Sequence, residues 1–200
     1  MTQMVQNNIP ASKQVKAYIK RKPYVLEAIE QNIVNYSALA REVGKELGIE
    51  NTNTIKVALT RECEKYRKNR RNIQQKAINL LRESDFSIKN KIAALHCDSF
   101  SDIDAIAYSK TPSGYMFFLD ENVAKSTSFK KIDYGFAILH IKSSKKIENV
   151  PGVIAFILNS FASEGINVSH VMGCREDTFI VVKEQDAAIA YSILAQNLRL

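Results

Sequence analysis

A run of short polar and basic side chains between Asn51 and Arg61 could contact nucleic acid. Its first four residues, NTNT, are types that commonly cap the N-terminus of a helix. Short polar side chains there can donate hydrogen bonds to phosphate, which the helix dipole also favours, while Lys and Arg can reach phosphates or base edges. The predicted nucleic-acid-binding residues are Asn51, Thr52, Asn53, Thr54, Lys56, Thr60 and Arg61.

Apolar residues recur at three- and four-residue steps over residues 12–84, which predicts helices. These helices would position the polar and basic side chains. Pro23 breaks one helix and can begin the next. The segment SALAREVGKEL, for which Ser37 is the expected N-cap, should end at Gly48, and another helix should then begin. A helix, a short turn and a second helix are the pattern of a helix-turn-helix. A helical bundle that only packs or dimerises is the alternative.

Charge divides the chain near residue 84. Residues 1–84 hold 16 Lys and Arg against 8 Asp and Glu, whereas residues 85–200 hold 12 against 13. A basic part predicts a polyanionic partner, with a merely solvated basic surface as the alternative. The basic run at 67–71 should lie within a long helix or at a break between two helices. That segment would join the two parts and could also contact a second copy.

The remaining motifs indicate no catalytic or metal-binding chemistry. The cysteines and histidines are Cys63, Cys97, Cys174, His96, His140 and His170. Their spacing matches neither C-x-x-C nor H-E-x-x-H, so we expect three small buried thiols and no metal, and a metal- or thiol-based sensor is a disfavoured alternative. No phosphate-binding glycine loop or G-x-S-x-G occurs, which predicts no enzyme activity, no catalytic residue and no cofactor. The absence of a long apolar run or signal peptide predicts a cytoplasmic protein without a membrane partner.

Beyond Asp85 the pattern changes to strands. Two apolar runs flank the turn TPSG and predict a β-hairpin, and a further strand is expected from Tyr134 to Ile141. An apolar helix over 152–164 then ends at Gly165, followed by two strands and a second amphipathic helix that Asp186 should open. Strand, helix, strand, strand, helix is most of a ferredoxin-like βαββαβ unit.

The motifs N-V-P-G-V from Asn149, G-I-N-V from Gly165 and T-F-I-V-V from Thr178 resemble an ACT domain. The resemblance covers 134–198 and is strongest to the regulatory ACT domains of aspartokinases. It implies amino-acid binding at the turn before the first helix, often across a subunit interface. The implied ligand-binding residues are the backbone of Val150, Pro151, Gly152 and Val153 and the side-chain amides of Asn149 and Asn167.

Physical chemistry is compatible with such a site. Gly152 would let the backbone approach a ligand closely, and free N–H groups at a helix start favour a carboxylate. An amide side chain can bond both the amino and the carboxylate group of an amino acid. The alternative is that Pro-Gly only shapes the turn and that Asn167 only tolerates a strained backbone.

This unit lacks its fourth strand, because the chain reaches Leu200 directly after the last helix. The strands within Ile88–Leu119 could supply that strand, and they resemble a shortened ACT-type unit whose second helix, at 122–127, is very short. The resemblance therefore implies an interlocked tandem pair, in which the first unit has no Pro-Gly turn for a ligand. We predict a basic helix-turn-helix domain at 1–84, a degenerate ACT-like unit at 85–133 and an ACT domain at 134–200.

The predicted fold class is thus α+β, with a helical domain joined by a long helix to ferredoxin-like ACT units. We expect a transcriptional regulator that binds DNA, responds to an amino acid and forms a homodimer through its ACT domains or its long helix. The segment IVNYSALAREV beside an ACT domain resembles uncharacterised archaeal proteins. The alternative is a regulatory or assembly subunit that binds another protein, such as an amino-acid biosynthetic enzyme, with the ACT half serving only dimerisation.

Overall fold

A computed structural model describes residues 9–129 and 131–199 of the chain, with side chains described as far as residue 196. The chain forms two compact units that divide between Asn72 and Ile73. This division falls inside a helix, whereas the predicted boundary lay after it at residue 84. The reason is that the last turns of this helix, with Ala77 and Leu81, pack into the core of the second unit.

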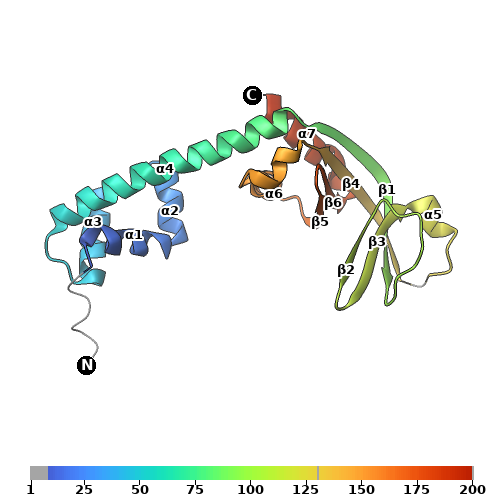
Figure 1. The fold of residues 1–200 in the computed structure, drawn as a ribbon, viewed down its shortest axis with the longest axis horizontal. Helices are drawn as coiled ribbons and strands as arrows, with labels where there is room; N and C mark the ends of the chain where they lie inside the picture. The colour runs from blue at the N-terminus through green and yellow to red at the C-terminus, as the bar shows by residue number, and fades with distance from the viewer. Residues whose placement is uncertain (1–8, 130, 200) are drawn as a thin grey trace. The chain divides into compact units, whose positions relative to one another are not determined.

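The first unit contains four helices around one apolar core (Figure 1). Their bounds are α1 Ala11–Lys20, α2 Pro23–Glu30, α3 Tyr36–Leu47 and α4 Thr52–Arg82. Pro23 occupies the first turn of α2, and Gly48 ends α3 in the left-handed conformation with φ 67°, as the sequence predicts. The prediction of Ser37 as N-cap is wrong: Asn35 caps α3, because its Oδ1 accepts hydrogen bonds from the backbone N–H groups of Ser37 and Ala38.

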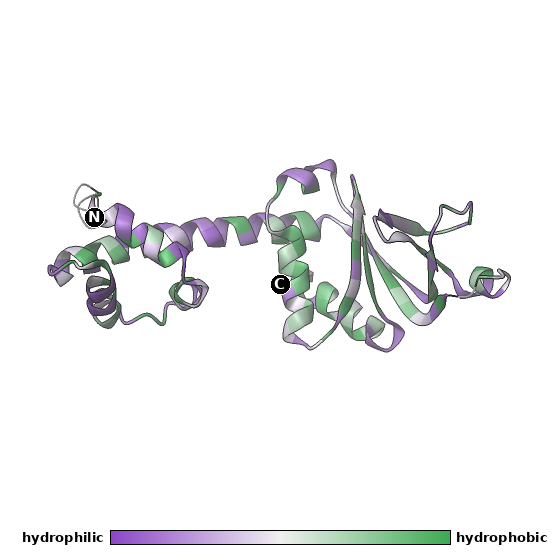
Figure 2. Ribbon diagram, turned by 90° about the horizontal axis from the view of Figure 1, so that it is seen from below, coloured by the Kyte–Doolittle hydropathy of each residue, from purple (hydrophilic) through white to green (hydrophobic). Residues whose placement is uncertain are grey.

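Helix α4 is continuous over 31 residues, so the basic run at 67–71 lies within a helix and not at a break. Figure 2 shows mostly hydrophilic colouring along the middle of this helix. Its first part, with Ile55 and Leu59 fully buried, belongs to the core of the first unit. Its last part contributes to the second unit, so one regular element supplies side chains to both cores.

The second unit is built on a six-stranded antiparallel sheet with the order β2-β3-β1-β4-β6-β5 (Figure 1). The strands are β1 Asp85–Cys97, β2 Ala107–Thr111, β3 Gly114–Asp120, β4 Ile132–Lys142, β5 Val168–Cys174 and β6 Asp177–Lys183. The helices are α5 Glu121–Lys125, α6 Val153–Ser163 and α7 Ala187–Arg199, with 3-10 turns at Lys145–Asn149 (η2) and Glu184–Asp186 (η3). Asp186 lies in a short turn directly before α7, at the position where the sequence predicts the cap of the last helix.

The two strand regions predicted as separate units, 85–133 and 134–200, share this sheet. The unit formed by β4, α6, β5, β6 and α7 lacks a fourth strand of its own. Strand β1 fills that position, because it pairs with β4. The sequence prediction that a preceding strand supplies it is confirmed. Conversely, β4 completes the smaller set of β1, β2, β3 and α5. Each of the two central strands therefore serves both halves of the sheet.

A β-bulge in β1 redirects its side chains. Lys91 has φ 56°, and the pairing of β1 with β4 shifts register between Lys89 and Ile92. Ile88 consequently packs into the cluster beneath α6 and α7, whereas Ile92 lies in the cluster on the opposite face. On that opposite face the ring of His170 in β5 lies 4.9 Å from the ring of Phe118 in β3. Because these strands are not adjacent in the sheet order, the sheet must be curved on this face.

The cysteines differ in exposure. Cys63 is buried in the first unit, Cys97 is half-buried and Cys174 is exposed. The expectation of three buried thiols is therefore wrong for Cys174, because it ends the edge strand β5. Burial raises the pKa of the Cys63 thiol, which keeps that group protonated at neutral pH.

Candidate functional site

The start of α4 gathers the residues predicted to contact nucleic acid. Asn51 caps the helix, because its Oδ1 accepts a hydrogen bond from the N–H of Thr54 at 3.0 Å. Six of the seven predicted side chains are exposed. The exception is the half-buried Thr60, whose hydroxyl donates to the carbonyl of Lys56 at 3.0 Å. The exposed members of the set lie in the first turns of one helix.

A close approach of α3 to the start of α4 fixes the position of these turns. A Cβ atom on Gly44 would lie 2.9 Å from the carbonyl oxygen of Ile49 and 3.1 Å from the Ile55 side chain. A contact of 2.9 Å to a backbone atom is essentially never seen, so a larger residue at Gly44 would push the turn away from α3. The sequence analysis recognised the helix-stopping Gly48 but missed Gly44. A glycine one turn earlier, inside an amphipathic helix, was the available signal.

Part of the basic charge in the first unit is already paired. Arg70 lies 3.3 Å from Glu30, and Arg67 donates to the side chain of Asn32. By contrast, Lys68 and Arg71 are exposed and make no side-chain hydrogen bond or ion pair with any described residue. A surplus of positive charge therefore remains on the outer side of α4.

One lysine of this unit is bound to its neighbours. The Nζ of Lys22 lies 2.6 Å from Glu46 and 2.9 Å from the hydroxyl of Tyr18. These two hydrogen bonds, that with Glu46 first, raise the pKa of Lys22 above its usual value. Because Lys22 is charged at any working pH, this cluster links α1, α2 and α3 without acting as a switch.

The predicted ligand turn lies before α6. Gly152 has φ 86°, and a Cβ atom on it would lie 3.1 Å from Cγ2 of Ile73 in the last part of α4. Asn149 and Pro151 are exposed, Val150 is half-buried, and Val153 is buried as the first residue of the helix. Glycine is thus favoured here by its left-handed backbone, and the close approach of α4 leaves little room for a Cβ atom.

The structure does not bring Asn167 to this turn. Asn167 is exposed and follows α6, whereas Asn149 precedes it. The 11-residue helix separates the two amides by about 16 Å, at 1.5 Å per residue. Within one chain, therefore, the six predicted ligand-binding residues do not form one site. A site that uses both amides would need a second copy of the chain.

A charged hollow of about 320 Å³ lies beside the predicted turn. Lys145 and Glu148 of η2 and Arg175 of the β5–β6 turn line it. A backbone hydrogen bond of 2.8 Å from the N–H of Ser143, two residues before η2, to the carbonyl of Glu176 holds the start of this segment against the β5–β6 turn. The three charged side chains are exposed and pair with no described residue, so they are available to a ligand. Two cations and one carboxylate can bind a small molecule that carries both an anionic and a cationic group.

Sequence reasoning missed this hollow. The charged residues directly before the Pro-Gly turn were a visible signal. Arg175, however, reaches them only through the pairing of β4 with β6, which aligns Lys142 with Asp177. No local pattern reports that register.

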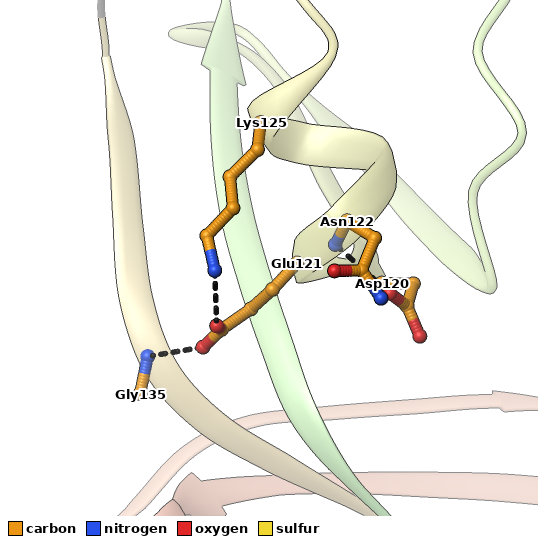
Figure 3. A network of polar contacts seen from close by, with 5 residues as sticks. All are labelled: Asp120, Glu121, Asn122, Lys125 and Gly135. Carbon is orange, nitrogen blue, oxygen red and sulfur yellow. Dashed lines mark hydrogen bonds and ion pairs between the residues drawn. The ribbon is translucent and has the colours of Figure 1, made fainter.

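The other half of the sheet has no comparable turn. Asp120 instead caps the five-residue α5, accepting from the N–H of Asn122 at 2.9 Å, and Glu121 accepts from the N–H of Gly135 and pairs with Lys125, both at 3.4 Å (Figure 3). The backbone hydrogen bond from Asn122, assisted by nearby Lys89, lowers the pKa of Asp120. These polar groups fasten α5 to the sheet and are satisfied by their neighbours.

Among the described residues, no group of three or more His, Cys, Asp or Glu could hold a metal ion. Over the same part of the chain, no helix combines the length and the apolar character needed to cross a membrane.

No family model matches the chain, and no curated protein matches its sequence significantly. The fold is nevertheless similar to solved structures. A protein of unknown function from Vibrio cholerae, described as a possible transport protein, is 16% identical with a TM-score of 0.50, covering 63% of this chain and 98% of that one. This likeness shows a shared mixed α/β fold.

Two regulatory subunits of aspartate kinase, the enzyme family whose ACT domains the sequence resembles, match less closely. The ligand-free subunit from Thermus thermophilus is 12% identical with a TM-score of 0.47, covering 57% of this chain and 97% of that one. The subunit from Thermus flavus is 12% identical with a TM-score of 0.46, covering 57% and 96%. At these values function has to be argued from the chain's own residues.

Proposed function

We propose that the protein is a regulator that binds DNA through α3 and α4 and responds to an amino acid bound by the strand-containing unit. The observation that carries the DNA-binding part is the exposed, Asn51-capped start of α4 in a basic helical unit. No catalytic step is part of this proposal, and the chain's residues would act by binding alone.

The order of helices supports DNA binding. Helix α3 ends at Gly48, a short turn follows, and α4 begins with exposed polar side chains, which is how a helix-turn-helix presents its second helix to the major groove. The exposed N–H groups of the first turn and the unpaired cations along α4 both suit phosphate. In a homodimer, two such helices would need to be about 34 Å apart to meet successive turns of DNA.

The charged hollow supports amino-acid binding. Lys145 and Arg175 can bind the carboxylate of a free amino acid, and Glu148 can bind its ammonium group. A hollow of about 320 Å³ has room for an amino acid and its water. This ligand set differs from the residues implied by the ACT resemblance, although it adjoins the same turn.

Helix α4 offers a route from ligand to DNA. The Pro-Gly turn that follows η2 lies against Ile73, and α4 also carries the residues proposed to contact DNA. A ligand that moves η2 would therefore bias the position of the last turns of α4. Such coupling is reciprocal, so DNA should change the affinity for the amino acid by the same factor.

DNA binding is tested by fluorescence anisotropy with labelled duplexes between 50 and 200 mM salt. We expect affinity to fall steeply with salt, because Lys and Arg contacts to phosphate release counterions. The Lys56→Ala/Arg61→Ala variant should bind at least tenfold more weakly, with a salt slope shallower by about two. The matched control, Lys131→Ala/Lys142→Ala, removes the same charge from the second unit and should bind normally. Equal losses in both variants would contradict a DNA face at α4.

Amino-acid binding is tested by a thermal-shift screen of the full chain against the twenty amino acids. A specific ligand at about 100 times its Kd should add about 2.7 kcal/mol of stability. Glu148→Gln should abolish the shift, whereas Glu164→Gln, the same change at an exposed site beyond α6, should retain it. A screen without any shift would remove the amino acid from the proposal and leave the DNA-binding part to stand on its own test.

A protein-binding subunit is the second candidate, favoured by aromatic rings on the first half of the sheet. Phe100 and Tyr108 are each 55% exposed, and their ring centroids are 5.8 Å apart. Exposed aromatic clusters are enriched at protein interfaces. Salt separates the two candidates, because a protein partner held by these rings would show little of the salt dependence that phosphate contacts impose.

A further inference from the structure

A second hollow, of about 320 Å³, lies in the first unit between α1, α2 and α4. Three lysines are among its lining residues, two from α1 and one from α4: Lys16, Lys20 and Lys65. The apolar lining comes from all three helices: Ile19, Leu26 and Tyr66. The hollow plays no part in the proposed contacts to DNA or to an amino acid, so it raises a separate question.

The lysines of α1 have no partner in the protein. Lys16 and Lys20 are exposed, and neither forms an ion pair or side-chain hydrogen bond with a described residue. Their four-residue spacing places two like charges on the same side of α1, which slightly destabilises a helix. An anion between the two ammonium groups would relieve this repulsion.

The third lysine is only partly neutralised. Nζ of Lys65 lies 3.2 Å from Oε1 of Glu62, and Glu62 also lines the hollow. The lining therefore carries three positive charges against one negative charge. An anion is favoured over a cation or a neutral molecule on charge alone.

The floor of the hollow is apolar. Ile19 is only 4% exposed, and the half-buried Leu26 and Tyr66 pack against the core of the unit. Phosphates of a DNA backbone would use the lysines but would leave this apolar surface empty. A small molecule with an anionic head and a flat apolar body would use both.

We propose that this hollow binds a small organic anion, with its carboxylate or phosphate on the lysines and its apolar body against Leu26 and Tyr66. The site shares no lining residue with the proposed DNA face, although Lys65 follows Arg61 on α4 by four residues, which is about 6 Å along the helix axis. The inference does not depend on the proposed function, because it rests on unit-one side chains that the DNA contacts do not use.

The test uses 8-anilinonaphthalene-1-sulfonate, an aromatic anion whose fluorescence rises in apolar sites, titrated into the full chain. A unit charge about 4 Å from the anion changes affinity about fivefold in water. The Lys16→Ala/Lys20→Ala variant should therefore bind at least fivefold more weakly. The control Lys45→Ala/Lys68→Ala makes the same charge change on α3 and α4 outside the hollow and should bind like the parent protein.

Glu62→Gln provides a change of opposite sign. It removes the only negative charge among the lining residues and frees Lys65, so the probe should bind two- to fivefold more tightly. Because the probe also binds loosened states that keep their helical circular dichroism, Glu62→Gln must in addition retain the near-ultraviolet circular dichroism and the unfolding midpoint of the parent protein. Weaker binding by a well-folded Glu62→Gln would overturn the proposal.

Competition identifies the chemistry of the ligand. Phenyl phosphate and benzoate should displace the probe better than inorganic phosphate or acetate, because only the first two fill the apolar floor. Equal displacement by the head groups alone would overturn the inference of an organic anion. Lysine-dependent displacement by duplex DNA but not by phenyl phosphate would show a phosphate-backbone contact instead, and the small-molecule site would be rejected.

Discussion

The two halves of the sheet share a strand plan but differ in what covers them. The half formed by β4, β6 and β5 lies beneath α6, α7 and the last turns of α4. The half formed by β2, β3 and β1 is covered by the five-residue α5 and by the non-helical segment 98–106. The helices cover the two halves unequally, but the halves form one continuous sheet because β1 pairs with β4.

The difference also separates two kinds of surface. Under the helices Phe161 is fully buried, whereas Phe100 in the covering segment of the other half is 55% exposed. Phe100 forms a cluster with three further rings: Tyr108, Tyr115 and Phe117. The helix-covered half has the charged hollow, and the other half has aromatic rings that a partner could contact.

The largest expected effect comes from a matched pair of Phe→Ala changes. Phe161→Ala should lower the free energy of unfolding by about 3–5 kcal/mol, because it leaves a cavity in a closed core. Phe100→Ala should cost about 1 kcal/mol, the scale of exposed aromatic contacts. Urea unfolding followed by circular dichroism measures both. Similar losses would mean that the segment 98–106 closes its half as tightly as a helix does.

A second pair of substitutions compares two left-handed glycines, Gly152 beneath α4 and Gly135 in open space. Gly152 and Gly135 have φ of 86° and 78°, so alanine at either should cost about 1–2 kcal/mol for the left-handed backbone. Gly152→Ala should cost more, because its Cβ would approach Cγ2 of Ile73 at 3.1 Å while nothing lies within 4 Å at Gly135.

The excess at Gly152 can be isolated with a double-mutant cycle. In an Ile73→Ala background the Cγ2 atom is absent, so the cost of Gly152→Ala should fall to that of Gly135→Ala. An unchanged cost in that background would show that α4 does not press on the Pro-Gly turn, and the proposed route from ligand to α4 would lose its basis.

The smallest expected effect tests whether the halves touch across the curved face. Burial, and then the charge of His96, lower the pKa of His170, whose buried Nδ1 has no hydrogen-bond partner. Below about pH 6.5 His170 binds a proton more readily in the unfolded chain than in the folded protein, where its pKa is lowered. The free energy of unfolding should therefore fall as the pH drops from 7.5 to 5.5. His170→Leu should reduce this pH dependence. An unaltered profile would place the ring in water and away from Phe118.

Local patterns predicted much of the fold because they report local physics. Pro23, Gly48 and the TPSG turn act through backbone conformation, so their positions were readable without tertiary context. The N-cap of α3 was misassigned because Asn35 and Ser37 are both capping types. Only the reach of the Asn35 Oδ1 to two N–H groups decides between them.

The candidate sites were harder to predict. The exposed start of α4 follows from one helix and was foreseen, but the charged hollow joins Arg175 to η2 through strand register. The lysine-lined hollow similarly depends on how α1 meets α4. Within one chain the ligand set implied by the ACT resemblance does not come together, because Asn167 follows α6 and Asn149 precedes it; whether a second copy completes it stays a prediction. Contacts between distant segments leave no periodic trace in the sequence.

The sharing of β1 and β4 has a consequence for biosynthesis. As the chain leaves the ribosome, β1, β2 and β3 emerge before the strand that β1 must pair with, since Asp85 pairs with Lys142. Until β4 is synthesised, the segment of β1, β2 and β3 would expose the unpaired edge of β1, which favours aggregation. Fragments ending near residue 133 should consequently depend on chaperones, and the nascent chain should acquire protease resistance abruptly once β4 has cleared the exit tunnel.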